Sequence, residues 1–330
     1  MAHIVITTIF PATEAIRLFS KLTQHNLIVV GDKKTPSDWF CDGVDYISAT
    51  QQQTLRYALA RQLPCNHYCR KMIGYLRAIE QGAEVIIDTD DHNFPKENWH
   101  FPNMTGQFET ITEEQGFINV YQLFTKQKIW PRGLPVSLIN KQFDFTDKIS
   151  TIHCSIGIWQ SLADGNPDVD AIYRLTNNQH CVFDDRPPIV LSKGTLCPFN
   201  SQNTLFKKEL FTLLYLPTSV TFRFTDILRG LVAQPIMWTK NLRLGFSGAT
   251  VTQHRNTHDL SADFESEIPM YLLTEKVVSI VSDSIDQSAN IADNLYNAYH
   301  TLAKEHVVES RELETLSAWL NDIQALASTS

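Results

Sequence analysis

The N-terminal part of the chain alternates between short apolar runs and stripes of apolar residues at helical spacing. The runs predict buried strands and the stripes predict helices, at residues 3–8 (strand), 12–22 (helix), 26–30 (strand), 66–81 (helix) and 84–88 (strand). Asn66 can cap the longer helix, and Gly82 can end it. Strands that alternate with helices in this way predict an α/β fold.

The rest of the chain divides into a loop-rich stretch, at 98–147, and a helical C-terminal region. A helix begins at Thr225, which we expect to cap it, and bends or ends near Pro235. Two apolar stripes predict further helices, with Ile291, Leu295, Tyr299 and Leu302 in one and Leu313, Leu316, Leu320 and Ile323 in the other. We therefore expect a main domain at 1–265 and a helical extension at 266–330 that packs on it or on a partner.

Composition and charge narrow the class of protein. The chain has 330 residues, 43% of them hydrophobic, and can bury a large core. Its formal net charge of −8 argues against a general electrostatic attraction to nucleic acid or to an anionic membrane. The six cysteines lack the spacings of a zinc site, which predicts free thiols. No secretory signal or membrane-length apolar run is visible, so we expect a cytoplasmic protein.

The acidic run Asp88-Thr89-Asp90-Asp91 follows a predicted strand directly. Ligands of open α/β sheets bind at the carboxyl ends of strands, and Mg²⁺ or Mn²⁺ prefers oxygen ligands of this kind. One or two carboxylates together with diphosphate oxygens suffice to hold such an ion. A solvated strand-to-loop turn would carry the same residues, and the spacing alone leaves both interpretations open.

Cations and a further carboxylate extend this candidate site. Arg70 and Lys71 lie on the helix before the acidic run and can bind a diphosphate, although a solvated helix face explains such a pair as well. Asp226 falls in the first turn of a predicted helix, whose dipole keeps a carboxylate ionised and available as a general base. An aspartate at that position is often only structural.

Two histidines, His254 and His258, are candidates for a further metal ligand, and either is more often an ordinary hydrogen-bonded residue. Asp168 and Asp170 alternate with apolar neighbours, and a turn that enters a strand explains them equally well.

Several segments together resemble the STELLO-type glycosyltransferase-like family, in order and with compatible spacing over most of residues 1–271. They are the stretch 70–83 with the acidic run after it, Trp130-Pro131-Arg132-Gly133-Leu134-Pro135, residues 167–176, Asn200-Ser201-Gln202-Asn203-Thr204, and residues 223–230.

The resemblance implies a GT-A fold, an α/β sandwich that binds a nucleotide-sugar on a mostly parallel sheet, at 1–265. It places Asp88 at the ribose, Asp32 near the base, Asp226 on the acceptor side, and the metal on Asp90, Asp91 and His258, with His254 a poorer choice. It also implies that the nucleotide-sugar site includes Thr7, Thr8, Arg70, Lys71, Arg132, Asn203, Arg223 and Arg229.

The implied activity is a hexosyltransferase-like transfer, dependent on Mn²⁺ or Mg²⁺. A sugar moves from a nucleotide-sugar, in the first place a UDP-sugar, to a glycan or lipid-linked glycan in cell-surface polysaccharide synthesis. The resemblance suggests a bacterial-type member, with peripheral attachment to a membrane-bound glycan assembly as one option. Two alternatives remain, a non-catalytic partner of a glycan-synthesis complex and a UDP-sugar mutase.

Overall fold

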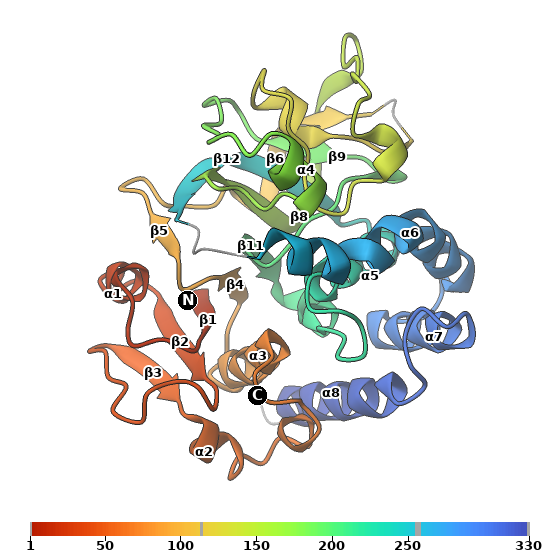
Figure 1. Cartoon of the computed structure of the whole chain (residues 1–330). Coiled ribbons are helices and arrows are strands. Elements are labelled where there is room, and N and C mark those ends of the chain that lie inside the picture. The colour runs from red at the N-terminus through yellow and green to blue at the C-terminus, as the bar shows by residue number, and fades with distance from the viewer. Residues whose placement is uncertain (1, 113–114, 255–258, 329–330) are drawn as a thin grey trace.

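The computed structural model describes residues 2–112, 115–254 and 259–328. One large sheet crosses the molecule (Figure 1), in the order β3-β2-β1-β4-β11-β8-β6-β9-β12-β5. Its strands are β1 (Ala2–Thr8), β2 (Asn26–Gly31), β3 (Val44–Ile47), β4 (Val85–Thr89), β5 (Asn93–Pro95), β6 (Thr105–Ile111), β8 (Ile149–Gly165), β9 (Ile189–Leu191), β11 (Asn203–Lys207) and β12 (Arg243–Gln253). Two short strands, β7 (Gly116–Phe117) and β10 (Thr195–Leu196), pair with each other.

Helices cover this sheet and continue past it. They are α1 (Glu14–Ser20), α2 (Ala49–Gln52), α3 (Lys71–Glu80), α4 (Ala171–Thr176), α5 (Thr225–Met237), α6 (Leu260–Ser284), α7 (Ile291–Lys304) and α8 (Glu312–Ala327). Short 3-10 helices lie at η1 (Leu59–Arg61), η2 (Tyr68–Arg70), η3 (Val120–Leu123), η4 (Val136–Leu138), η5 (Lys208–Leu214) and η6 (Trp238–Lys240). The predicted α/β class with a large sheet and a helical C-terminal region is confirmed.

The first half of the sheet is parallel and the second half is mixed. β1 runs parallel to β2 and to β4, and β2 runs parallel to β3. β11 is antiparallel to β4 and to β8, and both directions occur beyond it. The predicted parallel arrangement therefore holds for the β3-β2-β1-β4 half. In that half the carboxyl ends of β1, β2 and β4 meet at one edge, where such sheets bind ligands.

The helix predicted from Asn66 starts later than expected. Asn66 has a positive φ of 54° and does not cap a helix. His67 caps the 3-10 turn η2 instead, by accepting a hydrogen bond from the amide of Cys69, and α3 begins only at Lys71. Gly82 does end α3, because its φ of 77° suits the left-handed residue that closes a helix.

Three other local predictions need correction. Thr225 does not cap α5, since its hydroxyl donates to the carbonyl of Thr221. Asp170 leads into a helix and not a strand, because its side chain accepts from the amide of Tyr173 and caps α4. The loop-rich region contains β6, which the sequence pattern did not predict.

Glycine at position 74 lets α3 lie directly on the parallel strands. A Cβ atom built there would fall 2.5 Å from Cγ1 of Val5 and 2.9 Å from Cγ2 of Val30. Both distances are far below van der Waals contact, so any larger residue would push the helix off β1 and β2. This close packing fixes α3 over the parallel half of the sheet.

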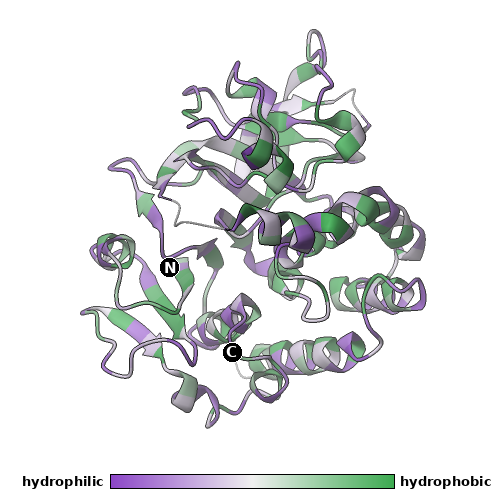
Figure 2. Ribbon diagram, in the orientation of Figure 1, coloured by the Kyte–Doolittle hydropathy of each residue, from purple (hydrophilic) through white to green (hydrophobic). Residues whose placement is uncertain are grey.

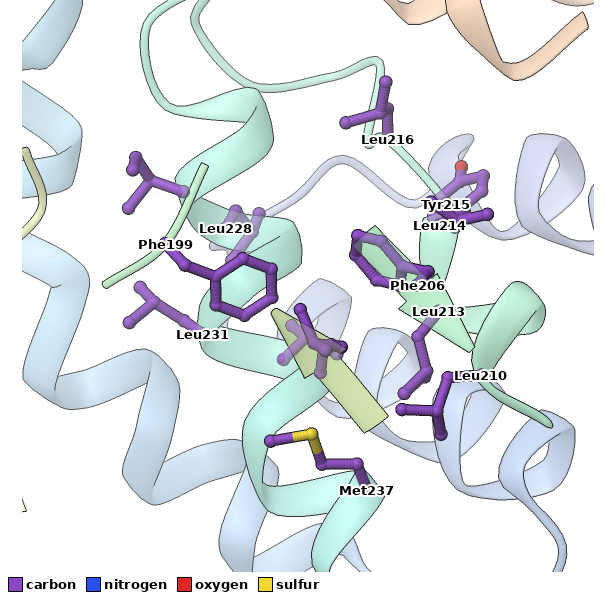
Figure 3. Packing of buried hydrophobic residues seen from close by; sticks show 14 of the residues in the cluster. Phe199, Phe206, Leu210, Leu213, Leu214, Tyr215, Leu216, Leu228, Leu231 and Met237 are labelled. Carbon is purple, nitrogen blue, oxygen red and sulfur yellow. The ribbon is translucent and has the colours of Figure 1, made fainter. Parts of the chain in front are cut away.

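The hydrophobic core is continuous between the sheet and the C-terminal helices. Figure 2 shows hydrophobic residues recurring along the central strands and on the helices around them. In Figure 3, Phe199 lies beside Leu228 and Leu231 of α5, and all three are at most 1% exposed. Burial of each such side chain contributes roughly 1.5–3 kcal/mol to folding. Leu295 and Leu302 of α7 and Leu316 of α8 belong to the same core.

All six cysteines are free thiols, as the sequence predicts, with Cys65 exposed and the other five buried. In the part of the chain that the structure describes, no helix has both the length and the apolar composition to cross a membrane.

Candidate functional site

A cavity of about 360 Å³ opens at the carboxyl ends of the parallel strands. This is within the size range of small-molecule sites. Residues from β1, β2, the turn after β4 and the start of α5 line it, together with segments at 66–70, 166–169, 201–202 and 222–223. The sequence prediction placed a site at this edge of the sheet, and the described chain forms a cavity there.

Most of the predicted site residues line this cavity, namely Thr7, Thr8, Asp32, Arg70, Asp90, Asp91, Arg132, Arg223 and Asp226. The others do not line it. Lys71, Asp88, Asn203 and Arg229 are buried, each at most 1% exposed. His254 is exposed and lies beside Phe94, with the ring centroids 4.5 Å apart. His258 lies outside the described residues.

Asp88 is the centre of a buried ion network. One of its carboxylate oxygens accepts from Lys71 Nζ at 2.8 Å, and the other accepts from Arg229 Nη1 at 2.8 Å. Burial lowers the pKa of Lys71, but Asp88 and Asp90 outweigh that effect and raise it, so the ammonium stays protonated. Asp88 is completely buried and does not line the cavity, so neither of its oxygens faces a ligand there. It ties α3 and α5 to the end of β4.

Asp90 is the acidic residue of this run with an available oxygen. Its Oδ1 accepts from Lys71 Nζ at 3.1 Å, whereas Oδ2 has no partner among the described residues. The side chain is 44% exposed and lines the cavity. Burial raises the pKa of Asp90 to about 6, and the neighbouring Asp88 and Asp91 add to this effect while Lys71 opposes it. A cation near Asp90 would relieve this crowding of negative charge.

Asp91 is held by the protein. Its Oδ2 accepts from the Thr8 hydroxyl at 2.6 Å, and Oδ1 lies 2.6 Å from His92 Nδ1. The hydroxyl of Thr13 donates to its backbone carbonyl at 2.6 Å. These contacts fix the turn after β4 against the end of β1.

The donor set near Asp90 fits a weakly coordinated Mg²⁺ or Mn²⁺ ion. Within residues 2–112, 115–254 and 259–328, no group of three or more histidine, cysteine, aspartate or glutamate side chains forms a closed metal site. Mg²⁺ commonly keeps several waters and takes its remaining ligands from one or two carboxylates and a diphosphate. One open carboxylate beside a cavity meets that requirement.

Arg70 offers hydrogen-bond donors to the cavity. Its Nε donates to Gln52 Oε1 at 2.6 Å, and its Nη1 donates to the carbonyl of Leu63 at 2.9 Å. Nη2 has no partner among the described residues, and the side chain lines the cavity. Two of the three guanidinium nitrogens thus fix the orientation of the third, which suits an anion.

Asp226 lies in a cluster of donors at the start of α5. Arg132 Nη2 lies 3.0 Å from each of its oxygens, Ser201 donates its amide at 3.1 Å, and the Tyr68 hydroxyl lies 3.2 Å away. Burial alone would raise the pKa of Asp226, but Arg132 and Arg229 outweigh it and hold the pKa below its ordinary value. The carboxylate is therefore ionised and weakly basic.

Arg132 also binds Asp168, with Nε and Nη2 donating to its two oxygens at 2.8 and 2.7 Å. Arg223 is held by a buried glutamate, Glu267, whose Oε1 lies 2.9 Å from Nε and 2.7 Å from Nη2. Asp32, which follows β2, accepts from the amides of Lys33 and His67 at 2.7 and 3.2 Å.

Sequence reasoning missed Phe222 as a residue of the cavity lining and Tyr68 as a partner of Asp226. Phe222 lines it with half of its surface exposed, and its ring lies edge-on to those of His67 and Tyr68, with centroids 5.2 and 4.7 Å away. Tyr68 also lines the cavity. Its hydroxyl accepts from the amide of Asp226 at 2.9 Å, a contact between residues far apart in the sequence. No local pattern marks such a contact.

Distant likenesses exist among solved structures. A mycobacterial protein is 11% identical, with a TM-score of 0.37 over 87% of this chain and 76% of that one. Glucosyl-3-phosphoglycerate synthase from Mycobacterium tuberculosis is 12% identical, with a TM-score of 0.35 over 83% of this chain and 80% of that one. A structure of the same enzyme in complex with Mg²⁺ and uridine diphosphate is 10% identical, with a TM-score of 0.37 over 83% of this chain and 78% of that one.

Similarity in sequence is much stronger for two plant proteins, although no protein-family model matches the chain. The probable glycosyltransferase STELLO1 of Arabidopsis thaliana is 28% identical over 98% of this chain, and STELLO2 of the same plant is 26% identical over 97%. The chain spans only 44% of the length of each. The resemblance to the STELLO-type glycosyltransferase-like family that the motifs predicted is therefore confirmed, and it extends over nearly the whole chain.

Proposed function

We propose that the chain is a metal-dependent glycosyltransferase that binds a nucleotide-sugar, in the first place a UDP-sugar, in the cavity at the end of the parallel strands. The observation that carries the proposal is the pairing of complementary open groups there. Asp90 presents a carboxylate oxygen and Arg70 a guanidinium nitrogen to the same cavity. A diphosphate with its divalent cation satisfies both. The description of the two plant relatives as probable glycosyltransferases supports the same reaction class.

In this proposal, different residues of the cavity lining bind different parts of the ligand. Arg70 binds the phosphate oxygens, and Asp90 holds Mg²⁺ or Mn²⁺ with waters completing the coordination. The ion would neutralise charge on the departing diphosphate. Asp32, at the end of β2, contacts the nucleoside together with Thr7 and Thr8. The buried ion network supports the site indirectly, because Lys71, Asp88 and Arg229 fix the turn that carries Asp90.

Asp226 is the proposed carboxylate on the acceptor side. An acceptor hydroxyl oxygen forms a bond to the anomeric carbon, the bond from that carbon to the diphosphate oxygen breaks, and the hydroxyl proton passes to Asp226. Because Arg132 lowers the pKa of Asp226, the carboxylate is ionised at neutral pH and orients the hydroxyl as much as it accepts the proton. The proposed acceptor is a glycan or lipid-linked glycan of a cell-surface polysaccharide.

Calorimetry with the full chain tests the proposal. UDP should bind in the presence of Mn²⁺ and at least about tenfold more weakly after chelation, because the cation bridges diphosphate and protein. Asp90→Asn should lose this metal dependence. The control is Asp283→Asn, which changes an exposed carboxylate on α6.

Equal UDP affinity with and without metal, or an Asp90→Asn protein that keeps the metal dependence, would contradict the metal role. Metal-dependent UDP binding without sugar transfer or donor hydrolysis across a donor panel would favour the non-catalytic alternative. A rearranged sugar nucleotide in the absence of any acceptor would favour the mutase.

A further inference from the structure

The C-terminal helices carry three carboxylates that point into the protein and not to solvent. Glu267 of α6 and Glu312 of α8 are fully buried, and Asp322 of α8 is 9% exposed. A buried carboxylate is costly unless hydrogen bonds satisfy it. All three bind donors that lie in, or lead to, the loops around the candidate site.

Glu267 connects two walls of the cavity. One oxygen accepts from Nε of Arg223, at 2.9 Å, and the other accepts from the amide of Ala171 at 2.6 Å. Arg223 lines the cavity, and Ala171 is the first residue of α4, two residues after the cavity segment 166–169. The Tyr271 hydroxyl also donates to Glu267, at 2.5 Å.

Glu312 holds the loop that leads into α5. The amide of Thr218 lies 2.9 and 3.1 Å from its two oxygens, and the amide of Ser219 donates at 2.7 Å. The hydroxyls of Thr218 and Tyr215 donate as well. Three residues after Ser219 the same loop carries the exposed ring of Phe222, and Asp226 follows in the first turn of α5.

Asp322 holds the segment that orients Arg70. Its two oxygens accept from the amides of Ala58 and Leu59, each at 2.9 Å, at the start of η1. The segment continues to Leu63, whose carbonyl accepts from Arg70 Nη1 at 2.9 Å. In Figure 1 the C-terminal end of α8 lies close to α3, the helix that follows Arg70, and the two helices are in contact.

From these contacts we infer that the helical region after residue 259 is part of the binding site, and that Glu267, Glu312 and Asp322 are its positioning residues. Each replaces the water that a loop amide or guanidinium would otherwise bind, and each fixes a part of the cavity lining. Glu312 sets the position of Phe222 and Asp226, Asp322 sets that of Arg70, and Glu267 sets that of Arg223.

The test compares Glu312→Gln and Asp322→Asn with a control that weakens the same helix without touching a loop. Leu316→Ala removes a fully buried α8 side chain of the hydrophobic core. Hydrogen exchange should accelerate about tenfold at Thr218 and Ser219 in Glu312→Gln and at Ala58 and Leu59 in Asp322→Asn, since each loses one good acceptor. In Leu316→Ala neither pair should accelerate selectively.

The second readout is the dissociation constant of UDP with Mn²⁺ in the full chain, and this arm alone rests on the proposed function. At a temperature where all three variants are folded, this dissociation constant should rise at least about fivefold in Glu312→Gln and Asp322→Asn. It should stay near the wild-type value in Leu316→Ala. If the wild type does not bind UDP, the proposed function fails, and the exchange arm still decides this inference. Loop-selective exchange without loss of affinity, or exchange that rises equally in all three variants, would overturn it.

Discussion

The ammonium of Lys71 lies 2.8 Å from a carboxylate oxygen of Asp88, and both side chains are completely buried. The same ammonium reaches Asp90 at 3.1 Å and the carbonyl of Thr89 at 2.8 Å. One cation at the start of α3 therefore determines the shape of the turn that follows β4. This buried contact thereby fixes the position of Asp90 at the edge of the cavity.

Replacing Lys71 by methionine should destabilise the protein by about 3–5 kcal/mol, because Asp88 and Asp90 lose their shared cation in a buried site. Urea unfolding followed by circular dichroism measures the change. Lys208→Met is the matched control, since its pair with Glu84 has both side chains more than half exposed. That variant should lose less than about 1 kcal/mol. Equal losses would show that burial does not govern the Lys71 contact.

Gly74→Ala should destabilise the protein by about 1–3 kcal/mol, although alanine is the better helix former. The cause is the clash of the added Cβ with Val5 and Val30. Thermal unfolding of a double-mutant cycle with Val5→Ala checks it, because removing the methyl group that the new Cβ meets should recover part of the loss. If the two substitutions lower the unfolding free energy additively, the contact with Val5 is not the cause of the destabilisation.

The stability that Asp226 contributes should depend on pH in one direction. Its folded-state pKa is lowered, so the contribution is complete above the unfolded pKa of 3.8 and is lost as pH falls through the folded value. Asp226→Asn should cost about 3 kcal/mol at neutral pH. In denaturant titrations the gap to the wild type should stay constant from about pH 5 to 8 and shrink below about pH 4. A gap that changes near neutral pH would contradict the low pKa.

Phe222→Ala should weaken ligand binding much more than folding. Half of the ring is already exposed, so the unfolding free energy should fall by less than about 1 kcal/mol. The affinity for a nucleotide-sugar or its acceptor should fall about fivefold, because a flat apolar ring at a cavity wall packs against a ligand. Phe40→Ala, at a side chain that is 74% exposed and outside the cavity lining, should leave affinity unchanged in calorimetry.

The sequence pattern could place a candidate site at the carboxyl end of β4, because an apolar strand followed by acidic residues is a local signal, and a cavity lies there. It could not assign separate roles within Asp88-Thr89-Asp90-Asp91. Which carboxylate meets solvent is decided by Lys71 and Arg229, and Arg229 comes from a helix far along the chain. The roles of the buried glutamates of α6 and α8 could not be predicted either, because their partners also lie far away in the sequence. In sequence they resemble the solvated face of an amphipathic helix.

The exposed thiol of Cys65 follows the segment that Asp322 holds, and lies next to Asn66 and His67 of the cavity lining. Because the other five thiols are buried, a maleimide fluorophore would attach at this position without any engineering of the chain. Its emission would then follow the environment of that wall directly. Fluorescence of the wild-type protein labelled at Cys65 would therefore report ligand binding in the cavity.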